Sequence, residues 1–323
     1  MSVSFGLTIP QRGALIGVGT IGELVALGPL AEETGMFDSV WVGDSLIAKP
    51  RPESISLLGA LAAITETITL GVGCMASFTV RDPVTFAYQW ASLDQLSEGR
   101  MLLAACSGIV PNGRASAREG EHFGGLKDVD RPAILEENMR LCRALWSGEP
   151  IDFDGTFRSY KGVQIQPTPV QDPCPIWIAA NPNPGKYFAR SMKRVANLAD
   201  GFQTCVMAPD AMRSMTTELR TQLIDAGRDP ESFPAMAYHN INIGADRDEC
   251  LRESKRFLDA YYGPVFSMEV VEAWTAAGTP EQCVDHLTNL IDQGANAITL
   301  RCTSFDQLDQ IQRLTKEVLP ALG

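Results

Sequence analysis

The stretch ITLGVGCMASFTVRDPVTFAYQWASLDQLSEGRMLLAACS, residues 68–107, decides the fold class of this chain. Two short apolar runs, residues 68–74 and 101–107, flank an amphipathic stretch that opens with Asp82 and Pro83. A capping residue followed by proline is typical of the first turn of a helix. The three segments together predict one strand–helix–strand unit of a parallel sheet.

The same alternation of apolar runs and amphipathic stretches continues along the chain. We expect a helix at residues 20–36, with Thr20 as its N-cap and Gly35 as its C-terminal stop, and another at residues 131–149. The expected strands are residues 3–9, 38–44, 68–74, 101–107, 175–181, 201–206, 235–243 and 297–303. Eight alternations favour a single (β/α)8 barrel over an open doubly wound sheet.

An extended insertion follows the fourth expected strand. Residues 109–172 are far more than one connecting helix needs, and residues 111–130 are polar and glycine-rich. Long loops at the carboxyl end of a barrel strand are often functional, so we expect a lid region here. Residues 151–173 indicate a small hairpin before the fifth strand. We expect residues 1–323 to form one domain that contains residues 109–172 as this insertion.

The composition excludes some classes of partner. With 27 Lys and Arg against 39 Asp and Glu, the formal net charge of −12 argues against a nucleic-acid footprint or an anionic membrane surface. The sequence shows neither a signal-peptide pattern nor an apolar run long enough to span a membrane, so we expect a cytoplasmic protein. Its eight cysteines are widely spaced and lack a CxxC pair, which favours reduced, mostly buried thiols over disulfides or a zinc site.

Several blocks of the sequence resemble the bacterial luciferase-like superfamily, in that family's order. They are FDSVWVGDS (37–45), TLGVGC through ACSG (69–108), LCRALWSGEPIDFDGTF (141–157), PTPVQDPCPIWIAANP (167–182), RVANLADGF (194–202) and GTPEQCVDHLTNLIDQGANAITL (278–300). The most specific piece is LDQLSEGR at residues 93–100. The resemblance implies a (β/α)8 oxidoreductase that uses reduced FMN or the deazaflavin F420, commonly as a homodimer.

The resemblance gives the end of the third strand a role. It implies that Gly73, Cys74 and Met75 support the central ring of the flavin, with a non-prolyl cis peptide bond between Gly73 and Cys74. Such a bond is rare and costs about 3–4 kcal/mol. The alternative interpretation is an ordinary buried strand end with small residues where a helix crosses.

Asp44 and Ser45 end the second expected strand. A carboxylate is costly to bury unless it is paired, so Asp44 is a candidate to orient a cofactor or substrate group, or else to cap the next segment. Relatives that are F420-dependent sugar-phosphate dehydrogenases place a histidine after this aspartate and a glutamate after the fourth strand. Ser45 and Ile109 stand at those positions here, which counts against the same proton-abstraction chemistry.

The resemblance implies cofactor contacts at two further turns. After the fourth strand they are Ser107, Gly108 and Asn112, although Asn112 is equally well explained as a turn residue. At the end of the fifth strand, the phosphate is expected at a helix N-terminus. The residues implied there are Ala179, Ala180, Asn181, Asn183 and Gly185, with Lys186 as a further candidate. Pro182 weakens this match because proline has no N–H to donate.

The sequence has three histidines. His239 lies in the seventh expected strand, where alternation leaves open whether it or Tyr238 points into the barrel. We take His239 as a candidate pocket group, with a core histidine as the alternative. His122 lies in the insertion, and His286 is expected to be a structural or surface residue. Arg301, at the end of the eighth strand, is a candidate for binding an anionic group or for a salt bridge.

These observations support three hypotheses. The leading one is a two-component monooxygenase that uses O2 and reduced FMN, supplied by a separate flavin reductase, on a small organic substrate; its candidate catalytic residues are His239, Asp44 and Cys74. The first alternative is F420-dependent hydride transfer, which needs no dedicated base when the acceptor is an activated alkene or nitroaromatic. The second alternative is a non-catalytic flavin-binding relative.

Overall fold

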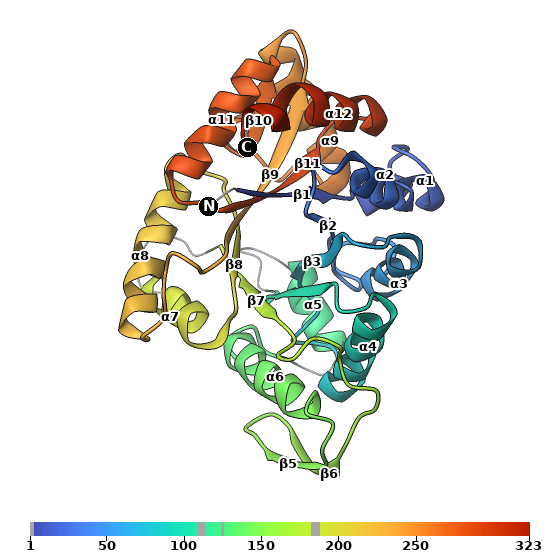
Figure 1. The fold of residues 1–323 in the computed structure, drawn as a ribbon, viewed down its shortest axis with the longest axis vertical. Helices are drawn as coiled ribbons and strands as arrows, with labels where there is room; N and C mark the ends of the chain where they lie inside the picture. Colours follow the sequence, from blue (N-terminus) through green and yellow to red (C-terminus); the bar gives the residue numbers. More distant parts are fainter. Residues whose placement is uncertain (1–2, 109–113, 124–125, 182–187) are drawn as a thin grey trace. The chain divides into compact units, whose positions relative to one another are not determined.

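The computed structural model describes residues 3–108, 114–123, 126–181 and 188–323 (Figure 1). Among them, one sheet has the strand order β10-β9-β11-β1-β2-β3-β4-β7-β8, and β9 also pairs with β8. The strands are β1 (Ser4–Thr8), β2 (Ser39–Val42), β3 (Thr69–Met75), β4 (Met101–Ala105), β7 (Ile176–Ala179), β8 (Phe202–Cys205), β9 (Ala235–Ile243), β10 (Thr275–Gly278) and β11 (Ala297–Cys302). The fold is the predicted (β/α)8 barrel.

All eight strands expected from the sequence are present, each within two residues of its expected bounds. β10, Thr275–Gly278, was not predicted. It consists of the four small residues TAAG, too short to give a periodic signal, and it pairs in parallel with the Asn240–Ile243 end of β9. All four residues of β10 are buried, and this burial stabilises a strand that is too short to be stable by itself.

Helices alternate with the strands. They are α1 (Ile21–Val25), α2 (Leu27–Thr34), α3 (Ser54–Ile64), α4 (Pro83–Leu96), α5 (Arg114–His122), α6 (Arg131–Leu145), α7 (Phe188–Leu198), α8 (Ala211–Asp225), α9 (Arg247–Tyr262), α10 (Met268–Ala273), α11 (Pro280–Asp292) and α12 (Gln307–Arg313). Short turns of 3-10 helix cover Gln11–Leu15 and Leu319–Ala321, and a π-helical turn covers Leu314–Val318. None of the helices described is both long and apolar enough to cross a bilayer.

The predicted caps are confirmed. Thr20 forms a capping box with Glu23, and Gly35 ends α2 with φ +63°. Asp82 accepts a hydrogen bond from the Thr85 N–H at the start of α4. The single helix expected at residues 20–36 is instead two helices. Pro29 supplies a reason, because it has no N–H to donate to the carbonyl four residues before it.

The insertion contains more regular structure than its composition indicates. Part of the polar stretch expected to be a loop forms α5, and the hairpin expected before the fifth barrel strand is confirmed as antiparallel β5 (Ile151–Asp154) and β6 (Ser159–Val163). Figure 1 shows this hairpin extending past α6. Glu137 of α6 holds the hairpin turn, because its carboxylate accepts hydrogen bonds from the N–H groups of Thr156 and Phe157 at 2.6 and 2.9 Å.

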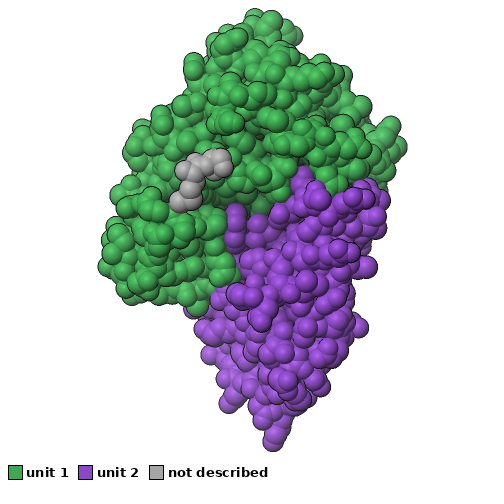
Figure 2. Space-filling view, viewed as in Figure 1, with its two compact units in different colours: residues 1–41, 180–323 green, residues 42–179 purple. Residues whose placement is uncertain are grey.

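The chain divides into two compact units (Figure 2). Unit 1 comprises residues 1–41 and 180–323, and unit 2 comprises residues 42–179. Each has its own buried apolar residues, such as Phe257 and Trp274 in unit 1 and Trp90 and Leu103 in unit 2. The expectation of one domain that spans the whole chain remains a prediction.

Candidate functional site

The end of β3 carries the backbone feature expected there. The peptide bond between Gly73 and Cys74 is cis, as predicted. Cys74 is partly exposed, whereas Met75 is fully buried. The register between β3 and β4 shifts between Gly73 and Met75, so the pleat is interrupted at Cys74. Cys74 therefore sits at an irregular strand end, where its side chain retains access to solvent.

The end of β4 lies against the end of β3. Gly108 adopts φ +70°, and a Cβ built on it would lie 2.3 Å from the carbonyl oxygen of Ala76. Only glycine fits this close approach without a shift of the backbone. The carbonyl oxygen of Ser107 accepts hydrogen bonds from the Thr79 hydroxyl at 3.3 Å and from Arg131 Nη1 at 3.4 Å. Ser107 and Gly108 thus form a turn whose backbone is fixed from several sides.

Two thiols meet between these strand ends. The Sγ atom of Cys106 lies 3.0 Å from the Sγ atom of Cys74, with Cys106 as the donor. This hydrogen bond lowers the pKa of Cys74, because it stabilises the thiolate, although burial opposes the effect. The same bond, together with burial, raises the pKa of Cys106 well above its usual value. Cys74 is therefore the more acidic and more exposed thiol of the pair.

Asp44 is buried and its carboxylate is fully engaged. It accepts hydrogen bonds from the Ser54 hydroxyl at 2.6 Å, the Ser77 N–H at 2.7 Å and Arg81 Nη2 at 3.3 Å. Arg81 also pairs with Glu53 at 2.7 Å and donates to the Ser77 hydroxyl. Asp44 therefore acts as a positioning residue that joins the residues after β2 to the turn after β3, instead of presenting a carboxylate to a ligand. The sequence-based account missed Arg81, although a buried carboxylate calls for a nearby cation.

Ser45 is also bound locally. Its hydroxyl donates to the carbonyl of Lys49 at 3.0 Å and accepts from the Lys49 N–H at 2.8 Å. The segment between them, residues 46–48, is held by Glu119 of α5. The Glu119 Oε2 atom accepts hydrogen bonds from the N–H groups of Leu46, Ile47 and Ala48 at 3.2, 2.8 and 2.7 Å.

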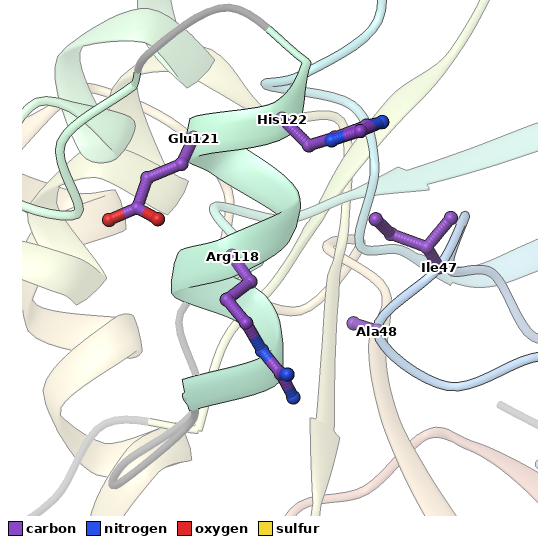
Figure 3. Close-up of a pocket in the computed structure, with 5 residues that line it drawn as sticks. All are labelled: Ile47, Ala48, Arg118, Glu121 and His122. Carbon is purple, nitrogen blue, oxygen red and sulfur yellow. The ribbon is translucent and has the colours of Figure 1, made fainter.

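A cavity of about 550 Å³ adjoins this clamped segment, where α5 faces Ile47 and Ala48. Its lining residues are Ile47, Ala48, Arg118, Glu121 and His122 (Figure 3). Figure 3 shows Arg118 and His122 extending from the side of α5 that faces Ile47 and Ala48, whereas the Glu121 carboxylate extends from the opposite side. The lining therefore includes a cation, an imidazole and the acidic residue Glu121, together with the apolar residues Ile47 and Ala48.

The candidates at the end of β7 are only partly described. The side-chain oxygen of Asn181 accepts hydrogen bonds from the Cys205 N–H at 2.7 Å and the Thr204 hydroxyl at 2.9 Å, and the Ala180 N–H donates to the Gln203 carbonyl. Ala179 is the last residue of β7. The remaining candidates lie outside the described residues, namely Ile109, Asn112, Pro182, Asn183, Gly185 and Lys186.

The structure contradicts the expectation that His239 is a pocket group. Its Nε2 atom lies 2.9 Å from Nε2 of His286, so the side chain points to α11, on the helix-facing side of β9. Burial, followed by the proximity of His286, lowers the pKa of His239 well below its usual value. The other face of β9 carries Tyr238 and Asn240. Alternation in the sequence did not reveal which face was which, because both carry polar residues.

Arg301 is fully buried and held by neutral groups. Asn240 Oδ1 accepts from its Nε and Nη2 at 3.1 and 2.7 Å, and the Tyr262 hydroxyl accepts from Nη1 at 2.6 Å. Four aromatic rings surround the guanidinium at 5.0–5.3 Å, namely those of Tyr238, Tyr261, Tyr262 and Trp274. Cation–π contacts of this kind stabilise a desolvated cation. Arg301 therefore organises the core of unit 1.

Comparison with known proteins identifies related sequences. A sequence profile described as luciferase-like monooxygenase matches residues 1–267. An F420-dependent glucose-6-phosphate dehydrogenase of Nocardia farcinica is 28% identical, over 93% of this chain and 94% of that protein. A protein of the same name from Mycobacterium avium is 27% identical, with the same coverage.

Solved structures support the same fold. An F420-dependent secondary alcohol dehydrogenase, in complex with an F420–acetone adduct, superimposes with a TM-score of 0.82 at 17% identity and covers 100% of both chains. A monooxygenase from Streptomyces bottropensis also has a TM-score of 0.82, at 21% identity, and covers 99% of this chain and 100% of its own. At these identities, the likeness shows the fold alone.

The expectation of a two-component FMN monooxygenase is wrong. The full-length curated relatives are named as F420-dependent dehydrogenases, which favours the hydride-transfer alternative. The non-catalytic alternative is not favoured either, since these relatives are named as enzymes. The strand-end residues could not separate the two cofactors, because FMN and F420 both present a flat tricyclic ring.

Proposed function

Because the chain belongs to the luciferase-like monooxygenase family, we propose that this oxidoreductase uses F420 and transfers a hydride between the deazaflavin and a small organic substrate. The observation that carries the proposal is the match, along 93% of the chain, to curated relatives named as F420-dependent enzymes. F420 would supply a ring carbon that gives or accepts the hydride, while the protein orients the two partners and excludes water.

The described residues at the ends of β3 and β4 fit such a ring. They are small or sulfur-bearing, namely Gly73, Cys74, Met75, Ala76, Cys106, Ser107 and Gly108. The approach of Gly108 to Ala76 leaves no space for a side chain at this turn. A surface without charge and without large projecting side chains fits a flat apolar ring better than it fits a charged group. We propose that these residues form the ring site, with Asp44 fixing the neighbouring turn through Ser77.

Ser45 indicates the type of substrate. Removal of a proton from an alcohol requires a base, and the Ser45 hydroxyl is instead tied to the backbone of Lys49. We therefore propose that the substrate accepts a hydride from reduced F420, as an activated alkene or a nitroaromatic does. Glucose 6-phosphate, named for the relatives, would require a base that Ser45 does not provide.

The cavity beside α5 provides the remaining chemistry. Reduction of an activated alkene by hydride leaves a carbanion that must be protonated. His122 is the lining residue whose imidazole can act as a general acid. Arg118 lies in the same lining and would attract a carbonyl or nitro oxygen that gains negative charge. We propose His122 as the proton donor and Arg118 as the anion-stabilising group.

Anaerobic turnover tests this proposal. Reduced F420 would be mixed with the protein and with a panel of cyclic enones and nitroaromatics, and oxidation of F420 would be followed by absorbance. We expect turnover with at least one of these acceptors. In a second experiment, oxidised F420 would be mixed with the protein and glucose 6-phosphate. Reduction of F420 in that mixture, without turnover of the acceptors, would contradict the proposed substrate but leave F420 as the proposed cofactor.

A further inference from the structure

We propose that Cys74 and Cys106 form a reversible disulfide, which makes the β3–β4 strand end a thiol–disulfide modification site. Their Sγ atoms are 3.0 Å apart. Closure to a bond of about 2.05 Å therefore requires a movement of only about 1 Å. The neighbouring positions are already paired across the sheet, since Gly73 pairs with Ala104 and Met75 with Ala105. The two cysteines thus need no change of strand register to meet.

The pair has one accessible and one protected member. Cys74 is partly exposed, whereas Cys106 is 8% exposed. Cys106 donates its S–H to the sulfur of Cys74, which makes Cys74 the nucleophile and Cys106 the resolving thiol. An oxidant can therefore reach Cys74 first and leave Cys106 in position to complete the bond.

The oxidation balances with hydrogen peroxide as the oxidant. The Cys74 thiolate attacks one peroxide oxygen, the O–O bond breaks, and the departing hydroxide takes a proton to become water, leaving a sulfenic acid on Cys74. The sulfur of Cys106 then attacks the sulfur of Cys74 and breaks its S–O bond. The hydroxide that leaves takes the Cys106 proton as a second water. Two thiols lose two electrons in total, and one peroxide is reduced to two waters.

Other cysteines serve as internal controls. Burial raises the pKa of Cys283 and of Cys302 to about 12, which keeps both protonated and poorly reactive near neutral pH. Cys205 on β8 is partly exposed, like Cys74, and provides a control of similar accessibility. Under mild peroxide, the loss of thiols should therefore be confined to Cys74 and Cys106, with at most single-residue oxidation at Cys205.

Peptide mapping of the full-length protein tests the proposal without any cofactor. The protein would be titrated with hydrogen peroxide, alkylated, digested without reduction and analysed by mass spectrometry. We expect a linked peptide pair that contains Cys74 and Cys106, the loss of two free thiols, and the recovery of both with dithiothreitol. Absence of the linked pair under conditions that oxidise Cys74 further would overturn the proposal, as would pairing of Cys74 with a different cysteine.

Variants sharpen the result. In Cys106→Ala, the Cys74 sulfenic acid has no resolving thiol, so we expect it to be trapped by dimedone and no linked peptide to form. Cys205→Ala should form the linked pair as the native protein does. Circular dichroism of each variant shows that the fold is retained. A Cys106→Ala protein that is folded, and whose Cys74 is neither trapped nor oxidised, would contradict the order of steps proposed.

Oxidation should also affect binding, and this consequence rests on the proposed function. Cys74 belongs to the proposed ring site, so the disulfide is expected to raise the Kd for F420, with recovery after dithiothreitol. Formation of the disulfide without a change in Kd would leave the modification site standing and contradict only its position under the ring. Failure of F420 to bind the reduced protein would contradict the proposed function, independently of the peptide mapping.

Discussion

Asp44 accepts a hydrogen bond of 2.7 Å from the backbone N–H of Ser77, and this contact joins the residues after β2 to the turn after β3. The same carboxylate accepts hydrogen bonds from the Ser54 hydroxyl and from Arg81. The irregular end of β3, which holds the proposed ring site, is therefore supported by a buried acid 33 residues before Ser77 in sequence.

Replacing Asp44 should destabilise unit 2. Asp44→Ala removes the acceptor of a buried N–H and of a hydroxyl, and we expect the free energy of unfolding to fall by about 3 kcal/mol. Urea unfolding measures this change. Asp285→Asn, at an exposed position of α11, is the control and should change stability by less than about 0.5 kcal/mol. Equal stabilities of the two variants would show that the Asp44 contacts contribute little.

Gly108 should tolerate no side chain. Gly108→Ala would place a Cβ 2.3 Å from the Ala76 carbonyl oxygen at φ +70°, whereas Gly227→Ala has nothing within 4 Å at φ +71°. Both variants carry the left-handed penalty of about 1–2 kcal/mol, so their difference isolates the clash. We expect Gly108→Ala to lose about 1–3 kcal/mol more than its control in thermal or urea unfolding. A smaller loss than the control would contradict the close approach.

Glu119 should keep residues 46–48 ordered. One of its oxygens accepts three backbone N–H groups, so Glu119→Ala leaves these donors without their carboxylate. We expect faster hydrogen exchange at Ile47 and Ala48, measured by mass spectrometry on peptides. Glu119→Gln retains an acceptor oxygen, so its exchange rates should lie between those of the native protein and those of Glu119→Ala. Unchanged exchange rates in Glu119→Ala would show that residues 46–48 stay ordered without the Glu119 carboxylate.

His239 should make stability depend on pH. Its pKa is lowered well below the usual value in the folded protein, so the unfolded chain binds more protons as pH falls below ~6.5. The contribution of His239 to stability is therefore complete above that pH and is lost progressively as pH falls toward the folded pKa.

The measurement is Tm between about pH 5 and 8, where the unperturbed histidine titrates. His239→Gln should show a shallower decrease of Tm on the acid side than the native protein. His122→Gln, which removes an imidazole at an exposed position, is the matched control. Identical slopes for all three proteins would contradict the assignment of a buried neutral imidazole to His239.

His122 should act in the chemical step. If its imidazole protonates the reduced substrate, His122→Asn should lower kcat by roughly 100-fold. The Kd for F420 should stay unchanged, because the residue lies in the cavity lining instead of at the strand ends. A rise in KM alone, with kcat intact, would assign His122 to binding.

Local signals were sufficient for much of the fold. The eight apolar runs, the Asp82–Pro83 start of α4 and the Gly35 stop are properties of short segments, and the structure retains them. The cis bond at Gly73–Cys74 followed from resemblance alone. The break between α1 and α2 could have been anticipated from Pro29.

The site depends on pairs that are distant in sequence. Arg81 reaches Asp44 across 37 residues, and Cys106 reaches Cys74 across 32. No periodicity within one segment predicts such contacts, because they exist only once neighbouring strands are aligned. His239 shows the same limit, since its direction depends on the position of α11. The homodimer and the phosphate site after β7 remain predictions.

The central claim is the identity of the cofactor, and one competition measurement addresses it directly. The protein, with its cysteines kept as free thiols, would be titrated anaerobically with F420 and, separately, with FMN. Each cofactor would be tested in its oxidised and in its reduced form, and the Kd values would be determined from cofactor fluorescence or absorbance. We predict tighter binding of F420 than of FMN and displacement of bound F420 only by excess FMN. Tight binding of reduced FMN with no binding of F420 would contradict the account.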